Sequence, residues 1–396
     1  MLGEGSDKKD EVTNHLTTWL RILKTKIEIE GLMKNVKDLV LDHLRSPKPY
    51  DAIRTVETLA AETGIPPSQM IRLNGNENSY GPSPKVGPAL GTFDQYNRYP
   101  DPQQTELRDA LSNYTGAHRD SIVAGNGSDE LIDLIIRLFV GKGDKIIEPS
   151  PTFGMYGFSA RLAQAEIIKV PRDTNFDLDI AQIKQVWDKQ TKVIFIAHPN
   201  NPTGNPAARE QIIELLHLNS IIVVDEAYHE YCGQTCIDLI NRYPNLIVLR
   251  TFSKWAGLAG LRIGLGVMNP EIAQLMMTIK PPYNMNRAAE EALKASLEDK
   301  ELLISRIAPV IEQRERLFRL MRELPGITPI PSAANFMMLR LPQDRGLDIF
   351  HKLAARGILT RCYDYPEMTD CIRVSIGQQW EVDGFTEALT EILDQA

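Results

Sequence analysis

The chain has 396 residues, of which 43% are hydrophobic and 24% are charged, an ordinary globular composition with enough length for two domains. Its formal net charge is −8 without a basic tract, and no apolar run approaches the roughly 20 residues of a membrane-spanning helix. We therefore expect neither a nucleic-acid partner nor a membrane. The four cysteines and seven histidines are scattered, so we expect no metal site and no disulfide framework. With an N-terminus that lacks an apolar signal core, these features predict a cytoplasmic protein.

Residues 1–45 are expected to form a helical extension. Apolar residues recur there at three- and four-residue steps in two runs: Leu16, Leu20, Leu23 and Ile27, then Val36, Val40 and Leu44. We expect this stripe to pack on the small domain or at a dimer interface. A membrane-surface role is the weaker alternative, because acidic residues interrupt the polar face.

Residues 46–80 are expected to join the smaller domain to the rest of the chain. The proline-containing stretch SPKPY ends the preceding helix, because proline cannot continue it. A short helix then follows and stops at Gly64. The remainder of the segment is expected to be mostly extended and rich in turns.

Residues 81–285 alternate apolar strands with helices and form the larger predicted domain. The expected strands are short apolar runs at 145–147, 167–170, 193–197, 221–224, 246–249 and 263–267. Helices are expected between several of them, for example at 129–140 and 209–216. Continuous β-branched runs bounded by helices predict an α/β fold, with a mostly parallel sheet covered by helices on both faces.

Residues 286–396 show a different pattern and predict a smaller α+β domain. A long helix comes first, short strands are expected at 335–339 and 371–376, and a helix closes the chain. We therefore expect two domains of unequal size.

Polar residues follow several of the predicted strands, at the position where open α/β sheets bind ligands. In the first such group, Gly125 and Gly127 permit tight backbone geometry at the start of a helix. The free amides of Ser128 and Asp129 can bind an anion there. Ordinary helix capping by these two residues is an equally good interpretation. If an anion binds, the carboxylate of Asp129 must point away from it.

Two more groups follow later strands. Asn201, in PNNPTG, can offer its amide to a ligand, although turns of this composition are common. Asp225 ends a very apolar strand, so its carboxylate needs a cation or hydrogen-bond donors. A protonated ring nitrogen is one such cation, and Tyr228 can offer its hydroxyl to the same ligand. The alternative for Asp225 is a cap of the next helix.

The fourth group is TFSKWAGLAGLRIG, between two apolar strands. A lysine held rigidly in a cleft there, such as Lys254, can have a lowered pKa and a nucleophilic amine. Ser253 and Arg262 can hold a phosphate. A single Ser-Lys pair is weak evidence, because most lysines are solvated surface groups.

Taken together, the four groups match the requirements of pyridoxal 5′-phosphate. This cofactor needs a lysine for its aldehyde, a carboxylate for its pyridinium nitrogen, an anion site for its phosphate and donors for its phenolate oxygen. The motifs NPTG at 201–204, D-x-x-Y at 225–228 and Ser253-Lys254, with Arg262 eight residues after the lysine, resemble the class I and II aminotransferases of fold type I.

The resemblance narrows to histidinol-phosphate aminotransferases and covers roughly residues 45–396. It is carried by the stretches LNGNENSYGPSP, YNRYPDP, GNGSDELIDLIIRLF, PSPTFGMY, HPNNPTG, VVDEAYHEY, LRTFSKWAGLAGLRIG, PSAANFMML, GILTR and CIRVSIG. This resemblance implies a pyridoxal-phosphate enzyme that interconverts histidinol phosphate plus 2-oxoglutarate and imidazole acetol phosphate plus glutamate, in histidine biosynthesis.

The resemblance also assigns roles to single residues. Lys254 bonds the cofactor and moves the proton, and Asp225 pairs with the pyridinium nitrogen. The remaining cofactor contacts fall on Tyr228 and Asn201 at the phenolate oxygen, and on Ser253, Arg262 and the amides of Ser128 and Asp129 at the phosphate. Phe153 stands where the family often has tyrosine, so its ring can stack on the cofactor but a hydroxyl is lost.

Further implied roles concern the substrate and a second subunit. Arg361 in GILTR and Arg373 in CIRVS match the arginines that bind substrate anions. Tyr80 lies in a turn that can cover the substrate. Tyr99 would reach the cofactor phosphate of a neighbouring subunit, which implies a homodimer with shared active sites. From residue type alone, a weak surface ion pair is the alternative for either arginine.

Other functions remain open from the sequence. A phosphothreonine decarboxylase or an aromatic amino-acid aminotransferase uses nearly the same cofactor residues on the same fold. A pyridoxal-phosphate-binding regulator without turnover is the alternative from a different class. The intact lysine and both arginines disfavour the regulator. A nicotinamide enzyme is weaker still, because no G-x-G-x-x-G follows the first strand.

Overall fold

The structure is a computed structural model that describes residues 17–25, 35–46, 49–342, 345–363 and 365–395. The chain divides into two compact units, Met1–Pro49 and Tyr50–Ala396. In the first unit, residues 17–25 are helical, followed by α2 (Val36–Leu39) and the 3-10 helix η1 (Asp42–Leu44). Of the predicted stripe, Leu20, Leu23, Val36 and Leu44 lie on helices, whereas Val40 follows α2 in an extended conformation. Leu16 and Ile27 fall outside the described residues. What the stripe packs on remains a prediction.

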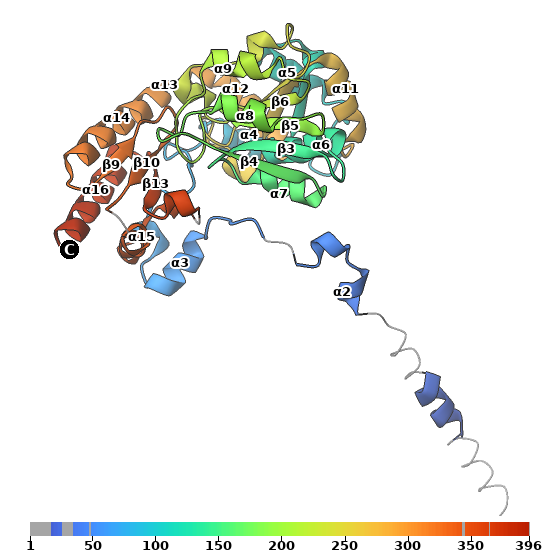
Figure 1. Cartoon of the computed structure of the whole chain (residues 1–396), viewed down its shortest axis with the longest axis horizontal. Helices are drawn as coiled ribbons and strands as arrows, with labels where there is room; N and C mark the ends of the chain where they lie inside the picture. The colour runs from blue at the N-terminus through green and yellow to red at the C-terminus, as the bar shows by residue number, and fades with distance from the viewer. Residues whose placement is uncertain (1–16, 26–34, 47–48, 343–344, 364, 396) are drawn as a thin grey trace, which may run out of the picture. The chain divides into compact units, whose positions relative to one another are not determined.

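A seven-stranded sheet forms the centre of the second unit (Figure 1). Its spatial order is β2 (Ile122–Gly125), β8 (Gly264–Met268), β7 (Leu246–Thr251), β6 (Ile221–Asp225), β5 (Thr191–Ala197), β3 (Lys145–Ser150) and β4 (Glu166–Pro171). Strand β8 is antiparallel to both of its neighbours, and the other neighbouring strands are parallel. The mostly parallel sheet is thus confirmed, and so are the six expected strands. The short strand β2 was not expected.

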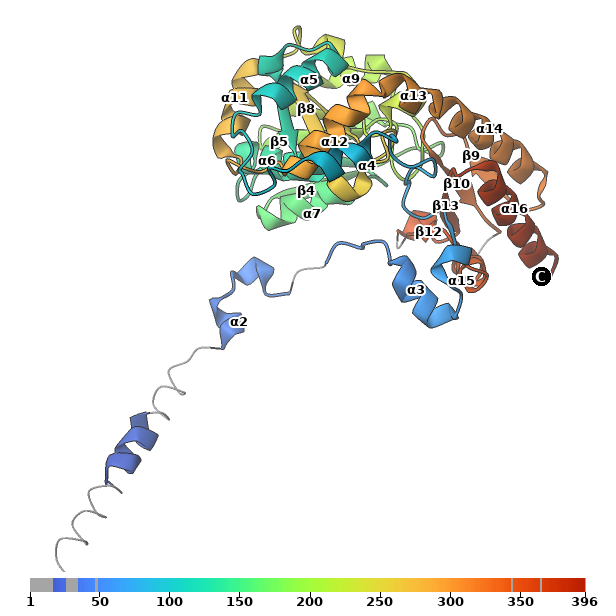
Figure 2. The ribbon, with the colours of Figure 1, turned by 180° about the vertical axis from the view of Figure 1, so that it is seen from behind.

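Helices cover both faces of this sheet because its strands alternate apolar side chains between two cores (Figures 1 and 2). On β5, Val193 and Phe195 face one core, while Ile194 and Ile196 face the other. The first core is closed by α6 (Gly127–Phe139), α7 (Met155–Leu162) and α11 (Pro270–Ile279). The second is closed by α4 (Val86–Thr92), α5 (Thr105–Thr115), α8 (Ile180–Val186), α9 (Arg209–Leu215) and α12 (Arg287–Glu298).

The C-terminal part contains a four-stranded antiparallel sheet. Its order is β12 (Arg361–Cys362), β13 (Cys371–Ser375), β10 (Phe336–Arg340) and β9 (Thr328–Ile330). The helices of this part are α13 (Lys300–Ser305), α14 (Ile307–Glu323), α15 (Gly346–Ala355) and α16 (Gln379–Asp394). The expected long helix is therefore three helices, α12 to α14.

The segment before the large sheet is tied to this small sheet domain. Helix α3 (Val56–Thr63) ends at Gly64, whose φ of +74° suits glycine, as expected. Strand β1 (Ile71–Arg72) then pairs in parallel with β11 (Ile358–Leu359). The joining role of residues 46–80 and the domain boundaries at 45, 80 and 285 remain predictions.

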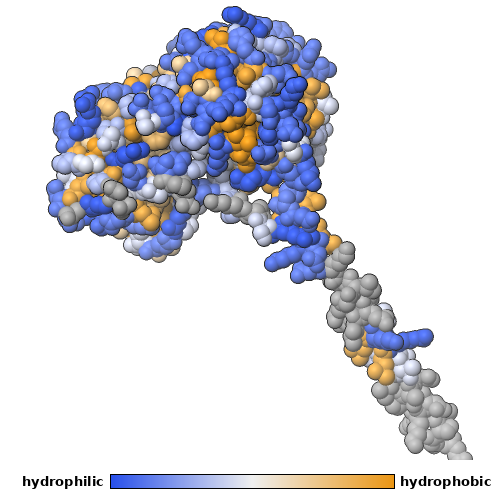
Figure 3. Space-filling view, in the orientation of Figure 1, coloured by the Kyte–Doolittle hydropathy of each residue, from blue (hydrophilic) through white to orange (hydrophobic). Residues whose placement is uncertain are grey.

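The remaining elements are short. They are α10 (His229–Cys232) and the 3-10 helices η2 (Pro67–Gln69), η3 (Arg119–Ser121), η4 (Ile237–Leu239), η5 (Ala259–Leu261) and η6 (Pro366–Met368). The face seen in Figure 3 is mostly hydrophilic, with small apolar patches. Within the described ranges, no helix is both long and apolar enough to cross a membrane.

Candidate active site

Lys254 lies in the turn that follows β7, where its side chain is enclosed by three parts of the fold. Its Nζ donates a hydrogen bond to the carbonyl oxygen of Gly75 at 3.2 Å and lies 5.8 Å from the ring centroid of Tyr228. Burial lowers the pKa of Lys254 to about 8, and the positive charge of Arg373 adds to this effect. The amine is therefore unprotonated more often near neutral pH than that of a free lysine, as a nucleophile requires.

The turn itself is held by short polar side chains. The hydroxyl of Thr251 donates to Ser253 Oγ at 2.9 Å and accepts from the backbone N–H of Ser253 at 3.2 Å. Both residues are buried. Because these bonds fix the backbone immediately before Lys254, the lysine is presented from a rigid base.

Asp225 is the last residue of β6 and faces α7. Its Oδ2 accepts a hydrogen bond from the Tyr156 hydroxyl at 2.8 Å, and its Oδ1 accepts from the backbone N–H of Ala227 at 3.1 Å. Only 5% of the residue is exposed, and burial raises the pKa of Asp225 to about 6. No cation pairs with Asp225 among the described residues. The pyridinium nitrogen of the expected cofactor is a cation that could pair with its carboxylate.

Tyr228 and Asn201 are linked to segments far away in the chain. The Tyr228 hydroxyl accepts a hydrogen bond from Asn76 Nδ2 at 3.0 Å. Asn201 Oδ1 accepts from Arg373 Nη1 at 2.7 Å. Burial raises the pKa of Tyr228 well above its usual value, so its hydroxyl stays protonated and can donate. These bonds bring the large sheet, the joining segment and the small sheet to one place.

The start of α6 offers backbone amides to an anion. Its N-cap residue, Asn126, makes no side-chain capping bond, so the first-turn amides of Ser128 and Asp129 are not satisfied in that way. Gly127 has φ of +72°, and a Cβ at Gly264 would collide with the backbone of Ser128. The backbone packs so closely here that residues 127 and 264 must be glycine.

Arg262 lies beside this helix start. Its Nη2 pairs with Asp129 Oδ2 at 2.8 Å, and both side chains are partly exposed. The carboxylate of Asp129 therefore points to Arg262, and its backbone amide remains available to an anion. This ion pair fixes the orientation of the guanidinium, whose remaining donors can still bind a phosphate oxygen.

Phe153 contributes an aromatic surface next to Asp225. Its ring packs edge-on against Tyr156, with centroids 5.6 Å apart, and against Tyr50 at 6.4 Å. Because Tyr156 also bonds Asp225, Phe153 lies where a stacked cofactor ring is expected. The structure thus links Phe153 through Tyr156 to Asp225, one of the candidate cofactor residues.

Arg361 and Arg373 come together on the small sheet. They are direct cross-strand partners in the antiparallel pairing of β12 with β13. Arg373 is buried, its Nη2 donates to the carbonyl oxygen of Asn74 at 2.6 Å, and its Nε has no hydrogen-bond partner among the described residues. A buried guanidinium with an unused donor is suited to an anionic ligand.

Two further predicted residues, Tyr99 and Tyr80, make contacts with residues other than those described above. Tyr99 is 81% exposed, and its ring stacks on Tyr283 with centroids 4.5 Å apart. Both rings line a hollow of about 530 Å³ together with Tyr96 and Met285. Tyr80 is half-buried against the core, and its carbonyl accepts a hydrogen bond from Arg306 Nη1 at 3.3 Å.

Several residues that contact the candidate site were not among the predicted site residues. Tyr156, Asn76, Tyr50 and Asp51 contact Asp225, Tyr228, Phe153 and Arg361, respectively. Tyr156 is the second residue of α7 and the last residue of PSPTFGMY, and Asn76 lies in LNGNENSYGPSP, so these two stretches of the family resemblance pointed to them. Tyr50 and Asp51 had no such signal, because their positions in the fold depend on long-range contacts of the joining segment.

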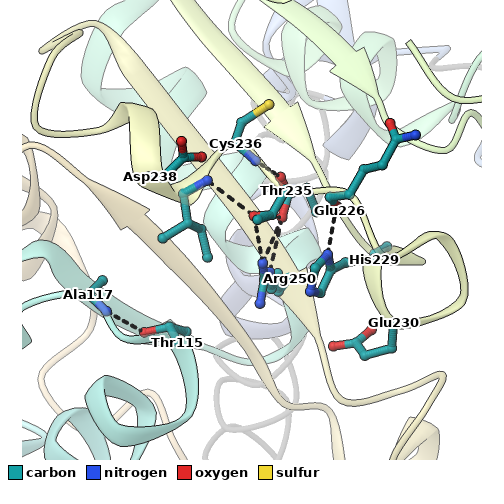
Figure 4. A network of polar contacts seen from close by, with 12 residues as sticks. Thr115, Ala117, Glu226, His229, Glu230, Thr235, Cys236, Asp238 and Arg250 are labelled. Atoms are coloured by element: carbon teal, nitrogen blue, oxygen red, sulfur yellow. Dashed lines mark hydrogen bonds and ion pairs between the residues drawn. The ribbon is translucent and has the colours of Figure 1, made fainter. Parts of the chain in front are cut away.

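A buried ion pair supports the site between β6 and β7 (Figure 4). Glu226 Oε2 accepts from Arg250 Nε at 3.0 Å and from the Thr235 hydroxyl at 2.9 Å, and Glu226 Oε1 accepts from the backbone N–H of Cys236 at 2.5 Å. Glu226 follows Asp225, and Arg250 precedes the turn of Lys254. The pair therefore ties together the two strand ends that carry the candidate catalytic groups.

Comparison with known proteins agrees with this arrangement. Residues 68–389 match the model of the aminotransferase class I and II family. The chain is 42% identical over 358 residues to the histidinol-phosphate aminotransferase of Dehalococcoides mccartyi, which covers 90% of this chain and 99% of that relative. It is 44% identical over 367 residues to the enzyme of the same name from Roseiflexus castenholzii, with 90% and 99% covered.

A solved structure gives the same result for the fold. The histidinol-phosphate aminotransferase from Sinorhizobium meliloti, in complex with pyridoxal 5′-phosphate, has a TM-score of 0.82 and 26% identity over 90% of this chain and 98% of that one. The expected fold type I architecture is thereby confirmed. The chain belongs to the aminotransferase class I and II family and, within it, to the histidinol-phosphate aminotransferases.

Proposed function

We propose that this aminotransferase interconverts histidinol phosphate plus 2-oxoglutarate and imidazole acetol phosphate plus glutamate. The observation that carries the proposal is the pair of arginines, Arg361 and Arg373, side by side on β12 and β13. Arg373 donates to the carbonyl of Asn74 and Lys254 donates to the carbonyl of the next residue, Gly75, so the candidate anion site lies close to the lysine. Both substrates of the reaction carry an amino or oxo group and a distal anion, so one lysine and one anion site can serve both.

The chain binds pyridoxal 5′-phosphate with residues whose chemistry fits each part of the cofactor. We assign the phosphate to the first-turn amides of α6, Ser253 and Arg262, and the pyridinium nitrogen to Asp225. Tyr228 and Asn201 are assigned to the phenolate oxygen, and Phe153 to the ring face. When bound, the cofactor withdraws electrons from the substrate's α-carbon and so makes its C–H bond acidic.

Lys254 carries out the proton transfer in this proposal. Its Nζ takes the proton from the substrate's α-carbon and returns it in the reverse half-reaction. A pKa of about 8 suits this role, because the amine must both accept and release a proton near neutral pH. The hydrogen bond to the Gly75 carbonyl orients Nζ in the free enzyme.

The arginines hold the distal anion in both half-reactions. A guanidinium fork binds a phosphate or a carboxylate with two parallel hydrogen bonds. We assign the phosphate of histidinol phosphate and a carboxylate of glutamate to this place. We also assign Tyr80 to cover the bound substrate, because it lies in a turn of the joining segment.

We also propose a homodimer with shared active sites. The support is the exposed Tyr99, whose ring is stacked on Tyr283 beside a hollow of about 530 Å³. Tyr96, Tyr99 and Tyr283 are all exposed and line this hollow together, and contiguous exposed apolar surface of this kind marks interaction sites. In a mixture of inactive Lys254→Ala and weakened Tyr99→Ala subunits, heterodimers should regain one working site. Activity that stays at the level of the separate variants would contradict shared sites.

The substrate assignment is tested with a small panel. Purified protein loaded with pyridoxal 5′-phosphate is mixed with histidinol phosphate, phosphothreonine or phenylalanine, each with 2-oxoglutarate, and glutamate and carbon dioxide are followed. Glutamate from histidinol phosphate, at a far higher kcat/KM than from phenylalanine, is expected. Carbon dioxide without glutamate would indicate a decarboxylase, and no turnover with any amine would indicate the regulator.

A further inference from the structure

The guanidinium of Arg361 has three partners from within the chain itself. Its Nη2 pairs with the carboxylate Oδ2 of Asp51 at 2.6 Å and donates to the backbone carbonyl of Asp51 at 2.5 Å. Its Nη1 donates to the carbonyl of Ala52 at 3.2 Å. Two carbonyls and one carboxylate therefore surround the group that the proposed function assigns to a substrate anion.

These contacts come from a strap formed by residues 50–52. At one end of the strap, the ring of Tyr50 packs edge-on against Phe153 at 6.4 Å and against Phe158 at 6.3 Å. A Cβ placed on Gly154 would lie 3.4 Å from the same ring. At the other end, Asp51 holds Arg361. The strap thus connects the aromatic surface of the cofactor site with the arginine pair.

The two partners of the ion pair differ in exposure. The side chain of Asp51 is 76% exposed, whereas that of Arg361 is 16% exposed. The carboxylate can therefore turn into solvent at little cost, but Arg361 loses much of its hydration whether or not it is paired. Arg361 needs an anion, and Asp51 is the one supplied by the chain itself.

We propose that Asp51 is a built-in competitor for the substrate's phosphate. Its carboxylate neutralises Arg361 in the free enzyme and gives way when a phosphate arrives. A phosphate can displace it because it carries more charge and more acceptor oxygens than a carboxylate. This inference rests on the proposed function and adds Asp51 as a residue that lowers the apparent affinity for ligands whose anion binds Arg361.

The cost falls only on ligands whose anion reaches Arg361. An internal competitor lowers the apparent affinity by the fraction of molecules in which the arginine is free. Exposed ion pairs are weak, so we expect Asp51 to lower the apparent affinity for such a ligand by a factor of about three to five. Histidinol phosphate should bear this factor, whereas histidinol, which lacks the phosphate, should not.

The test compares Asp51→Asn and Asp51→Ala with the unchanged enzyme, all loaded with cofactor. Asp51→Asn removes the charge and keeps the side-chain shape, and Asp51→Ala removes both. Glu57→Gln serves as a matched control, since it removes an exposed carboxylate from the neighbouring helix α3. We expect KM for histidinol phosphate to fall about threefold to fivefold in both Asp51 variants. KM for histidinol, kcat and the Glu57→Gln values should stay unchanged.

Two results would overturn the proposal. An unchanged or higher KM for histidinol phosphate would mean that Asp51 does not compete for Arg361. An equal fall in KM for histidinol would mean that the strap merely opens. If Asp51 had only a structural role, its replacement would change KM for histidinol phosphate and for histidinol alike.

A binding measurement separates this inference from the proposed function. Inorganic phosphate is titrated into the cofactor-loaded enzyme by calorimetry, so that the cofactor's own phosphate site is filled. Its affinity should rise about threefold to fivefold in Asp51→Asn, and this gain should vanish in Asp51→Asn/Arg361→Ala. If histidinol phosphate is not a substrate but the phosphate result holds, the proposed function fails and the competition stands. A gain that survives without Arg361 would refute the competition.

Discussion

Arg361 and Arg373 stand directly opposite each other on two antiparallel strands, so two positive charges share one cross-strand position. Like charges placed in this way destabilise a sheet. The protein offsets the repulsion with Asp51 on one side and with Asn201 and the Asn74 carbonyl on the other. The arrangement is costly for stability, and the anionic substrate group proposed for this place would offset the remaining repulsion.

Replacing Arg373 by lysine should weaken substrate binding without loss of the cofactor. Lysine keeps the charge but loses the fork that now contacts Asn201 and Asn74. We expect KM for both histidinol phosphate and glutamate to rise about tenfold to a hundredfold. Steady-state kinetics check this, with Arg340→Lys on the adjacent strand β10 as the control. An equal effect in the control would remove the special role of Arg373.

Lys254→Ala should abolish the covalent bond to the cofactor. The visible absorption band of the loaded protein should then disappear, and activity should fall below about a thousandth of the original value, because the base and the nucleophile are lost together. Absorption spectra at equal cofactor content provide the measurement. A retained band would show that another residue bonds the aldehyde.

Cofactor capture should depend on pH through Lys254. Its pKa is lowered to about 8, so the fraction of reactive, unprotonated amine increases as pH rises from 6.5 and levels off above pH 9. Stopped-flow absorbance of cofactor-free protein mixed with pyridoxal 5′-phosphate follows this step. In Arg373→Met the midpoint should move to higher pH, since a positive charge that lowers the pKa is gone. A downward shift would contradict the assignment.

Asp225 should make the cofactor-free protein less stable as pH rises. Its folded-state pKa, about 6, lies above its ordinary value of 3.8, so the folded protein binds this proton more tightly. The contribution is complete below about pH 4 and is lost as pH rises through 6, by on the order of 2–3 kcal/mol. Guanidinium unfolding at several pH values should show this loss, and Asp225→Asn should not. The two proteins should therefore differ in slope between pH 4 and 7, and equal slopes would disprove the link.

Glu226→Gln should destabilise the protein by about 3–5 kcal/mol, because it leaves the buried Arg250 without a counter-charge. Arg250→Met should cost a similar amount. The double variant should cost clearly less than the sum, since neither charge is then left alone. A double-mutant cycle by denaturant unfolding measures the coupling. Additive costs would mean that the pair in Figure 4 is not a unit.

Much of the large domain could be predicted from local patterns. The apolar runs of β3 and of β5 to β8 are continuous because both faces of the sheet are buried there, and the motif residues Asn201, Asp225 and Lys254 lie at or just after the ends of these strands. Strand β2, only four residues ending in glycine, carries too little pattern to be recognised. Its place beside the antiparallel β8 depends on pairing across more than a hundred residues, which periodicity does not encode.

The sequence by itself predicted the candidate cofactor residues, because their types, order and spacing form short motifs that resemble those of the family. Only the tertiary structure decided how those residues are held. Tyr156 reaches Asp225 from another layer of the fold, and Asp51 reaches Arg361 across 310 residues of chain. Such contacts arise from packing of separate elements, where burial and charge pairing act between positions that no local pattern connects.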